Sequence, residues 1–410
     1  MRAKPAQCAR ADRLSARLTA LHRTSGSNLG AGHASRAAEG AAGIPVGVRS
    51  RRTSLTATLF APMRFEHVRI AAVGHALPEE RVSSLEIERR LAPVYDRLRL
   101  CPGRLELMSG IRERRFWPRG TRPSAAAALA GAVALAQSGV PKERIGCLIH
   151  AAVSRDFLEP ATASVVHARL GLAPSCHVFD VSNACLGVLN GLVLVAGMIE
   201  REEIEAGLVV AGEDARALVE QTIASLLEHT GSDAELRVQL KQAFALLTIG
   251  SGAAALVLER ARSRTPGQRL LGGAVLAASE HHELCQGDRP GAGSGPIMAT
   301  DSEALLAAGT ELAARTFARF LEELGWTRAE IARVVTHQVG SAHRRALLEK
   351  LELAPDSDFP TLETLGNTGS AALPLSLALA LEAGFVRGGQ RLALLGIGSG
   401  LHSLMLGLSW

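Results

Sequence analysis

The segment LLTIGSGAAALVL, Leu246–Leu258, recurs near the end of this 410-residue chain as LLGIGSGLHSLML, Leu394–Leu406. Each copy follows a small-residue-rich helix and a strand in the expected pattern. Agreement in the flanks as well as in the IGSG tetrapeptide favours an internal duplication over chance repetition. The sequence therefore predicts two similar halves, residues 63–265 and 266–410.

Short β-branched or apolar runs alternate with helical stretches from Met63 onward, which is typical of an α/β protein. The expected strands are Val68–Val73, Cys147–Val153, His177–Val181, Leu208–Ala211, Ala254–Leu258, Leu271–Ala277, Val334–His337, Leu392–Leu395 and Leu404–Leu408. The expected helices are Ser124–Gln137, Leu186–Glu202, Ser302–Leu324, Ala342–Leu351 and Ala371–Ala383.

The net charge of +5 comes from the first 62 residues, which hold ten Lys and Arg against Asp12 and Glu39. The remaining 35 basic and 38 acidic residues nearly balance. This balance argues against nucleic-acid binding by the body of the protein. Residues 1–62 show no periodicity and are expected to be a disordered extension or a transit peptide, or to precede a true start at Met63.

Membrane and metal functions receive no support from the sequence. The longest apolar run, Leu186–Ile199, is too short to span a bilayer. The six cysteines have no paired short spacing that would indicate zinc or a redox dithiol. We therefore expect a cytoplasmic protein without a membrane span, a metal or another cofactor.

One cysteine stands at a position suited to nucleophilic chemistry. In VFDVSNACLGVLNGLVLVAGMIE, Val178–Glu200, a strand ends near Ser182 and an apolar helix begins around Cys185. The amides and dipole of a helix N-terminus favour a thiolate and would lower the pKa of the thiol. A single cysteine in an apolar stretch is more often a small buried hydrophobe.

Two further polar residues occupy similar strand-end or loop positions. VVTHQVGSAHRRALLEK places His337 between a strand and a helix, and TLGNTGSAALPLSLALALEAG places Asn367 in a turn before another helix. Either residue alone would be a satisfied structural group. Together with Cys185, in this order, they favour a catalytic site.

The chain resembles the ketoacyl synthase III branch of the thiolase superfamily in NACLG, THQ, GNTGSA and the closing GIGSG. SRDFLEPATAS, Ser154–Ser164, is similar to the OleA type, the head-to-head acyl-CoA condensing enzymes of bacterial olefin biosynthesis. The resemblance runs from about Met63 to Trp410. It implies the thiolase fold, a five-layered αβαβα arrangement of two duplicated halves, and an obligate homodimer.

The same resemblance implies roles for individual residues. Cys185 would be the nucleophile, and His337 and Asn367 would donate hydrogen bonds to the thioester oxygen. The backbone amides of Cys185 and Ser399 would form a second oxyanion site. Glu159 would reach the active site of the partner subunit, although without the resemblance it would be read as an exposed loop carboxylate.

The function that this resemblance favours is non-decarboxylative Claisen condensation of two fatty acyl-CoAs to a β-keto acid. The alternatives are a decarboxylating 3-oxoacyl-[acyl-carrier-protein] synthase III with a malonyl donor and a non-catalytic partner subunit. Downstream enzymes of olefin synthesis are candidate partners. In GIRERRFWPRG, the side chains Arg112, Arg114, Arg115 and Trp117 are candidates for CoA or carrier-protein contacts, and a solvated charged segment is an equal alternative.

Overall fold

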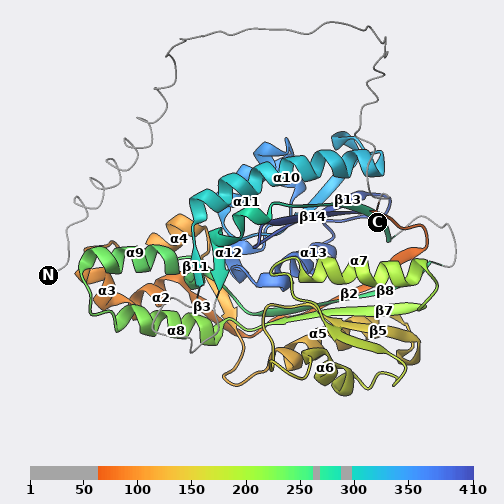
Figure 1. Cartoon of the computed structure of the whole chain (residues 1–410), viewed down its shortest axis with the longest axis horizontal. Helices are drawn as coiled ribbons and strands as arrows, with labels where there is room; N and C mark the ends of the chain where they lie inside the picture. The colour runs from red at the N-terminus through yellow and green to blue at the C-terminus, as the bar shows by residue number, and fades with distance from the viewer. Residues whose placement is uncertain (1–62, 262–267, 288–297) are drawn as a thin grey trace, which may run out of the picture. The chain divides into compact units, whose positions relative to one another are not determined.

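Two β-sheets joined edge to edge run through the computed structural model, which describes residues 63–261, 268–287 and 298–410 (Figure 1). The strand order is β12-β13-β14-β9-β2-β8-β7-β5-β6, with β1 beside β9. One residue pair, Arg69 with Arg269, joins β2 to β9. The strands therefore form an N-terminal sheet from β2 to β6 and a C-terminal sheet from β9 to β12.

The N-terminal sheet consists of β2 (Val68–Ala76), β5 (Ile145–His150), β6 (His177–Asp180), β7 (Ala206–Glu213) and β8 (Gly252–Arg260). The C-terminal sheet consists of β1 (Met63–Arg64), β9 (Arg269–Ala277), β12 (Ile331–Thr336), β13 (Arg391–Gly398) and β14 (His402–Ser409). Two small sheets pair β3 (Glu80–Ser83) with β4 (Glu113–Phe116) and β10 (Cys285–Gly287) with β11 (Met298–Thr300).

The two main sheets repeat one topology. In the first, β2 and β8 are antiparallel, β8 and β7 are antiparallel, and β7 and β5 are parallel. In the second, β9, β14, β13 and β12 follow in the same orientations. An isolated parallel bridge between Val334 and Asp358 stands where β6 pairs with β5 in the first half. The duplication expected from the IGSG repeat is thus present in the strand order.

Helices on both sides of each sheet complete five layers (Figure 1). The outer helices of the first sheet are α5 (Pro123–Ser138) and α6 (Thr162–Leu170), and those of the second are α10 (Ser302–Leu324) and α11 (Ser341–Lys350). The central layer holds α7 (Gly187–Glu200) and α13 (Ala372–Glu382). This is the five-layered αβαβα thiolase fold.

The central layer is apolar because both of its helices are covered on two sides. One cluster of buried side chains joins Leu189 and Val195 of α7, Leu375 of α13, Leu256 of β8 and Leu394 of β13. Separate clusters fill the spaces under α5 and under α10. A helix that is apolar on nearly every side, as α7 is, is stable only in such a position.

The remaining helices lie in the connections between strands. They are α2 (Ser84–Arg90), α3 (Ala92–Arg97), α4 (Arg104–Ser109), α8 (Arg216–Leu227), α9 (Asp233–Ala243) and α12 (Leu362–Leu365). Among the described residues, no helix combines the length and the apolar character needed to cross a bilayer. The predicted extension 1–62 and the proposed boundary between residues 265 and 266 lie outside the described residues.

Every predicted strand and helix is present, but only the helix Ser302–Leu324 agrees at both ends, and two of the differences are informative. The predicted strand Cys147–Val153 ends at His150, because the chain then turns into the loop that carries Glu159. The second IGSG copy turns directly from β13 into β14, whereas the first follows α8, α9 and a short 3₁₀ turn. The first copy was expected to follow a strand, and this expectation is wrong because β7 and β8 are separated by two helices.

Candidate active site

Cys185 lies in the tight turn between β6 and α7, as the sequence predicts. Ala184 has a φ of 44°, a left-handed conformation that costs an L-residue about 1 kcal/mol. The amide of Leu186 donates to the carbonyl of Asn183 at 2.9 Å and closes the turn. Helix α7 begins two residues after Cys185, at Gly187. The thiol is therefore presented just before the helix rather than within it.

The electrostatic surroundings of Cys185 differ from the expectation. Burial raises the pKa of the thiol to about 12, and the charge of Glu213 adds to this effect. The expected lowering by the helix N-terminus is wrong, because desolvation of a thiolate here outweighs the attraction of the helix amides. The resting thiol is therefore neutral.

Asn367 is held by the first IGSG turn. Its amide donates to the carbonyl of Thr248 at 3.1 Å, and its carbonyl accepts from the amide of Gly250 at 2.9 Å. A Cβ at residue 250 would lie 2.1 Å from the carbonyl oxygen of Leu365, so only glycine allows this approach. The side-chain Oδ1 of Asn367 accepts from the amide of Gly369 at 3.0 Å. Its Nδ2 is thereby the end that can donate to a substrate oxygen.

His337 follows the last residue of β12, and its amide donates to the carbonyl of Leu395 in β13 at 3.0 Å. Burial lowers the pKa of its imidazole to about 4, and neighbouring His343 contributes to the shift. Within the described residues, Nδ1 of His337 has no hydrogen-bond partner. The ring is therefore neutral near pH 7.

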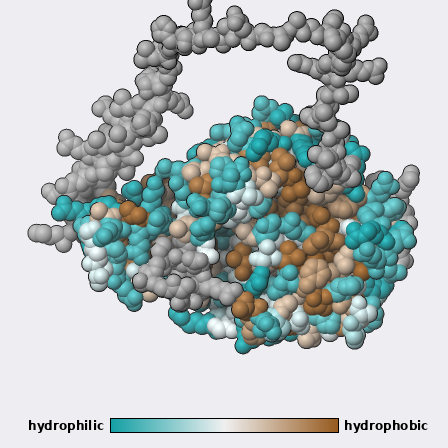
Figure 2. Space-filling view, in the orientation of Figure 1, coloured by the Kyte–Doolittle hydropathy of each residue, from teal (hydrophilic) through white to brown (hydrophobic). Residues whose placement is uncertain are grey.

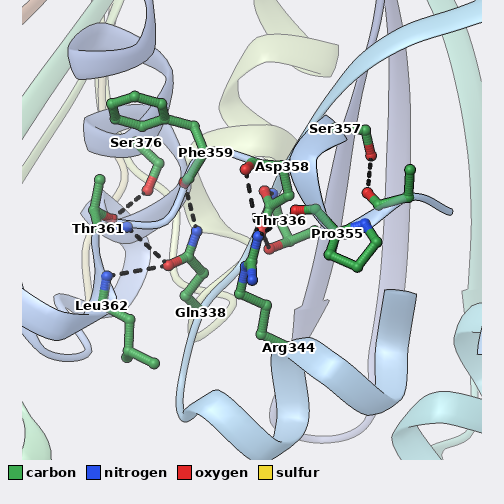
Figure 3. Close-up of polar contacts among 11 residues, drawn as sticks. Thr336, Gln338, Arg344, Pro355, Ser357, Asp358, Phe359, Thr361, Leu362 and Ser376 are labelled. Carbon is green, nitrogen blue, oxygen red and sulfur yellow. Dashed lines mark hydrogen bonds and ion pairs between the residues drawn. The ribbon is translucent and has the colours of Figure 1, made fainter. Parts of the chain in front are cut away.

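The residues on both sides of His337 are fixed by one polar network (Figure 3). The carboxamide of Gln338 donates to the carbonyl of Phe359 at 2.8 Å and accepts from the amides of Thr361 and Leu362 at 3.0 and 3.1 Å. The side chain of Gln338 is almost fully buried. Since Leu362 begins the short helix α12 that leads to Asn367, this contact sets the His337 and Asn367 loops relative to each other.

The other side of the network contains a buried ion pair. Asp358 accepts from the amide and hydroxyl of Thr336 and pairs with Arg344 of α11 at 2.6 Å (Figure 3). Burial raises the pKa of Asp358 even with this cation beside it. A buried carboxylate needs such a partner and donors, and together they anchor the end of β12 just before His337.

Ser399 lies in the turn between β13 and β14, and this turn packs against the Cys185 turn. A Cβ at Gly398 would lie 3.0 Å from Cγ and 3.5 Å from the amide nitrogen of Leu186, the residue after Cys185. A hydrogen bond links the same region to Asn367: the amide of Val188 in α7 donates to the hydroxyl of Ser370 at 3.0 Å. The turns that carry Cys185, Ser399 and Asn367 therefore meet at one place.

Unlike the turns of Cys185, Ser399 and Asn367, the loop that carries Glu159 is exposed at this residue. Glu159 sits at the end of the loop between β5 and α6, where both Leu158 and Glu159 are exposed. The loop is nevertheless well anchored, because Asp156 accepts from the amide and hydroxyl of Ser124 at 2.9 and 2.6 Å. The rigid loop presents the carboxylate of Glu159 at the surface of its own chain.

The basic segment expected to contact CoA is divided between interior and surface. Arg114 is fully buried and donates to the carbonyls of Val82 and Leu247, and the indole of buried Trp117 donates to the carbonyl of Glu213. Arg115 is half-buried and donates to the carbonyl of Pro78. Arg112 is exposed and pairs with Glu363 at 2.5 Å. Arg114 and Trp117 are thus structural interior residues, whereas Arg112 and part of Arg115 reach the surface.

Replacing Arg114 with Ala should destabilise the fold by about 2–4 kcal/mol, because it empties a buried volume and leaves carbonyl groups unpaired. Replacing Arg112 with Ala should change the free energy of unfolding by less than about 1 kcal/mol, as for an exposed ion pair. Thermal unfolding of the two variants measures the difference. An Arg114→Ala protein of wild-type stability with a raised KM for acyl-CoA would instead assign Arg114 to substrate binding.

The sequence analysis missed Glu213, the last residue of β7. Its carboxylate is buried, with 5% of the residue exposed, and lies close enough to Cys185 to raise the pKa of the thiol. The available signal was an acidic residue that ends the apolar strand run LVVAGE. A charge at the end of a buried strand is typical of a functional position.

Comparisons with known proteins agree with this arrangement. Residues 179–278 match the family described as 3-oxoacyl-[acyl-carrier-protein (ACP)] synthase III, and residues 321–410 match its C-terminal family. An acyl-CoA:acyl-CoA alkyltransferase of Shewanella oneidensis is 39% identical over 354 residues, which cover 85% of this chain and 100% of the relative. A protein of the same name from Xanthomonas campestris is 39% identical over 350 residues, with the same coverage.

Solved structures give the same result. A cysteine-to-serine variant of Xanthomonas campestris OleA with bound lauric acid and lauroyl-CoA is 38% identical, has a TM-score of 0.78, and covers 84% of this chain and 100% of its own. Proteins named β-ketoacyl-[acyl-carrier-protein] synthase III match at 25–29% identity. By its sequence and its fold, the chain belongs to the OleA-type acyl-CoA:acyl-CoA alkyltransferases of the thiolase superfamily.

Proposed function

We propose that this protein joins two fatty acyl-CoAs by a non-decarboxylative Claisen condensation and yields a β-keto acid after thioester hydrolysis. The observation that carries the proposal is the meeting of the Cys185 turn, the Asn367 loop and the Ser399 turn through the Val188–Ser370 hydrogen bond and the Gly398–Leu186 contact. A relative with 38% identity binds lauroyl-CoA.

In the first step, the thiol of Cys185 loses its proton to solvent, and the resulting thiolate attacks the thioester carbon of one acyl-CoA. The C–S bond to CoA then breaks, and CoA leaves as a thiolate that takes up a proton from water. The acyl group is then held on Cys185 as a thioester, which remains electrophilic. The neutral imidazole of His337 and the Nδ2 of Asn367 donate to the thioester oxygen as negative charge develops there. The backbone amides of Cys185 and Ser399 form the second oxyanion site, and each such donor contributes about 3 kcal/mol in the transition state.

In the second step, Glu159 removes a proton from the α-carbon of the second acyl-CoA. The resulting carbanion attacks the Cys185 thioester, a carbon–carbon bond forms, and the sulfur of Cys185 leaves. Water then cleaves the CoA thioester of the product and releases CoA and a β-keto acid. A decarboxylating synthase would need no carboxylate base, because loss of CO₂ itself leaves the carbanion.

Variants in the Xanthomonas campestris structures support the choice of residues. They replace one cysteine, one glutamate and one histidine, and that cysteine follows that glutamate at the same interval as Cys185 follows Glu159. These are the residue types proposed here for nucleophile, base and oxyanion donor.

The proposal includes a homodimer in which Glu159 completes the site of the partner. The exposed loop position of Glu159 and the 71% exposure of Leu158 beside it support this role. Figure 2 also shows apolar residues gathered on the face where α7 and α13 lie, and Leu194 of α7 is 45% exposed. Exposed apolar patches of this kind are typical of protein–protein interfaces.

The proposed substrates and product indicate where the enzyme acts and which enzymes use its product. Because acyl-CoAs are formed and used inside the cell, the proposal places the enzyme in the cytoplasm. The β-keto acid would pass to downstream enzymes of olefin synthesis. No cofactor is needed, since acyl-CoA is itself the activated substrate.

The deciding experiment is to incubate the purified protein with a long-chain acyl-CoA alone and to analyse the products by mass spectrometry. A β-keto acid, or the ketone formed from it by loss of CO₂, is expected without any malonyl donor. Product formation only when a malonyl thioester is added would contradict the proposal and favour the decarboxylating synthase.

Loading of Cys185 should accelerate with pH. Because the thiol pKa is raised to about 12, the thiolate fraction below that pH rises about tenfold per pH unit. Acyl-adduct formation, followed by intact-protein mass spectrometry between pH 6.5 and 8.5, should therefore increase steadily. A rate that is already constant above pH 6.5 would indicate a thiolate in the resting enzyme.

A further inference from the structure

The carboxylate of Glu213 accepts hydrogen bonds from three backbone amides and from the hydroxyl of Ser154. Its Oε1 accepts from the amides of Val153 at 2.9 Å and Ser370 at 3.0 Å, and its Oε2 accepts from the amide of Ser154 at 3.0 Å. These donors are 59, 60 and 157 residues away along the chain. One buried side chain at the end of β7 thus fastens two distant loops.

Both loops lead to residues of the proposed mechanism. Val153 and Ser154 begin the loop that carries Glu159, and the hydroxyl of Ser154 also accepts from the amide of Asp214 at 3.1 Å. Ser370 belongs to the loop that begins at Asn367, and its hydroxyl accepts from Val188 in α7. Glu213 therefore connects the base loop, the Asn367 loop and the helix that follows Cys185.

The junction around Glu213 leaves no room for larger residues. A Cβ at Gly369, which has a φ of 57°, would lie 2.9 Å from Oε1 of Glu213. A Cβ at Gly187 would lie 2.9 Å from the hydroxyl of Ser370 and 3.2 Å from the carbonyl of Ala151. Direct packing of the two loops on the helix depends on these glycines.

The charge of Glu213 also acts on the nucleophile. Among the described residues, the titratable groups that act on the Cys185 thiol are Glu213 on β7 and Cys285 on β10. The hydrogen-bonding groups that face Glu213 are the uncharged backbone amides of Val153, Ser154 and Ser370 and the hydroxyl of Ser154. Burial raises the pKa of Glu213, and these four donors oppose that shift because they stabilise the ionised form. In its ionised form the carboxylate is the nearby anion whose removal should favour the thiolate of Cys185.

We infer that Glu213 is a positioning residue for condensation, whose carboxylate holds the loops of Glu159 and Asn367 in place around Cys185. It does not touch the reacting atoms. This inference rests on the proposed function for its effect on condensation, but its effect on the Cys185 thiol can be measured without any acyl substrate.

Two variants separate the contacts of Glu213 from its charge. Glu213→Gln removes the charge and replaces one acceptor oxygen by an NH₂ group that faces an amide donor. Glu213→Asp keeps the charge but is one methylene too short to reach all three amides. A matched control is Glu88→Gln, because Glu88 is also buried and accepts from two backbone amides, those of Gly103 and Leu105, in another part of the fold.

Alkylation of Cys185 by iodoacetamide measures the charge effect. Removing a neighbouring anion lowers a thiol pKa by on the order of one unit, and the lower intrinsic nucleophilicity of the thiolate offsets part of the gain. Glu213→Gln should therefore react roughly three- to tenfold faster than wild type between pH 7 and 9. Glu213→Asp and Glu88→Gln should react at the wild-type rate. If alkylation is accelerated equally in Glu213→Gln and Glu213→Asp, the cause is easier access of iodoacetamide to Cys185. That result would overturn the charge effect.

Condensation and loading rates measure the positioning effect. Both Glu213 variants should still load acyl groups on Cys185, but should condense them about tenfold more slowly or worse, because small displacements of reacting groups have effects of this size. Glu88→Gln should condense normally if it folds. Wild-type condensation in both Glu213 variants would overturn the inference. If wild-type protein itself condenses no acyl-CoA, the proposed function fails, and alkylation still tests Glu213.

Discussion

Cys185→Ser should lower condensation by on the order of 10³-fold or more and leave the protein without an acyl adduct. A serine hydroxyl has a far higher pKa than a thiol, and in the described part of the chain no side-chain base is hydrogen-bonded to residue 185 that would activate it. Folding should persist, since the side chain keeps its shape in the turn. Intact-protein mass spectrometry after incubation with acyl-CoA measures the adduct directly.

Cys285→Ser is the matched control, because Cys285 is the other thiol whose charge reaches Cys185. This variant should load acyl groups as wild type does. Peptide mapping of the wild-type adduct to Cys285, or an adduct that persists in Cys185→Ser, would remove Cys185 from the mechanism.

Glu159→Gln should load acyl groups onto Cys185 at the wild-type rate and yet condense them at least about 10²-fold more slowly. The α-proton of a simple acyl thioester is weakly acidic, so its removal needs a positioned carboxylate, whereas attack of the thiol on acyl-CoA does not. Loading is measured by intact mass, and condensation by the β-keto acid or ketone formed from acyl-CoA alone.

Glu79→Gln supplies the control for Glu159, because Glu79 is another exposed glutamate adjacent to a proline. It should leave both rates unchanged. Condensation of acyl-CoAs by Glu159→Gln at the wild-type rate would exclude Glu159 as the base. Malonyl-dependent activity that survives in the same variant would then favour the decarboxylating alternative.

Mixed dimers test whether the base crosses the subunit interface. A dimer of one Cys185→Ser chain and one Glu159→Gln chain has one complete site if each Glu159 serves its partner, and none if it serves its own chain. About half of the wild-type rate per dimer is therefore expected. The two parent homodimers, measured beside it, should each condense at about 1% of the wild-type rate or less.

The sequence predicted the elements whose signals are local. The α7 helix is apolar on nearly every side, and the helix Ser302–Leu324 was predicted with the bounds that the structure shows. Cys185, His337 and Asn367 could be selected because each stands where a strand or loop meets a helix. The IGSG repeat predicted the duplication, since both copies directly precede the last strand of a half.

Long-range contacts could not be predicted in the same way. The sequence shows Glu213 only as an acidic residue at the end of an apolar strand. Its role depends on the amide of Ser370, which is 157 residues away. The raised pKa of Cys185 follows from burial by several elements, which outweighs the local helix effect that the sequence indicated. Arg114 alternates with its neighbours along β4, but which face of that strand is buried depends on the carbonyl of Leu247 and other distant groups.

Each IGSG turn supports a reactive residue that belongs to the other half of the protein. The turn of the first half pairs with Asn367 of the second, and the turn of the second half packs against Leu186, beside Cys185 of the first. A half that folds before the other therefore holds a reactive residue without its support. A chain that has not yet formed its second half would lack the Asn367 loop and the Ser399 turn beside Cys185. We therefore expect acyl loading of Cys185 to begin only after β14 has formed.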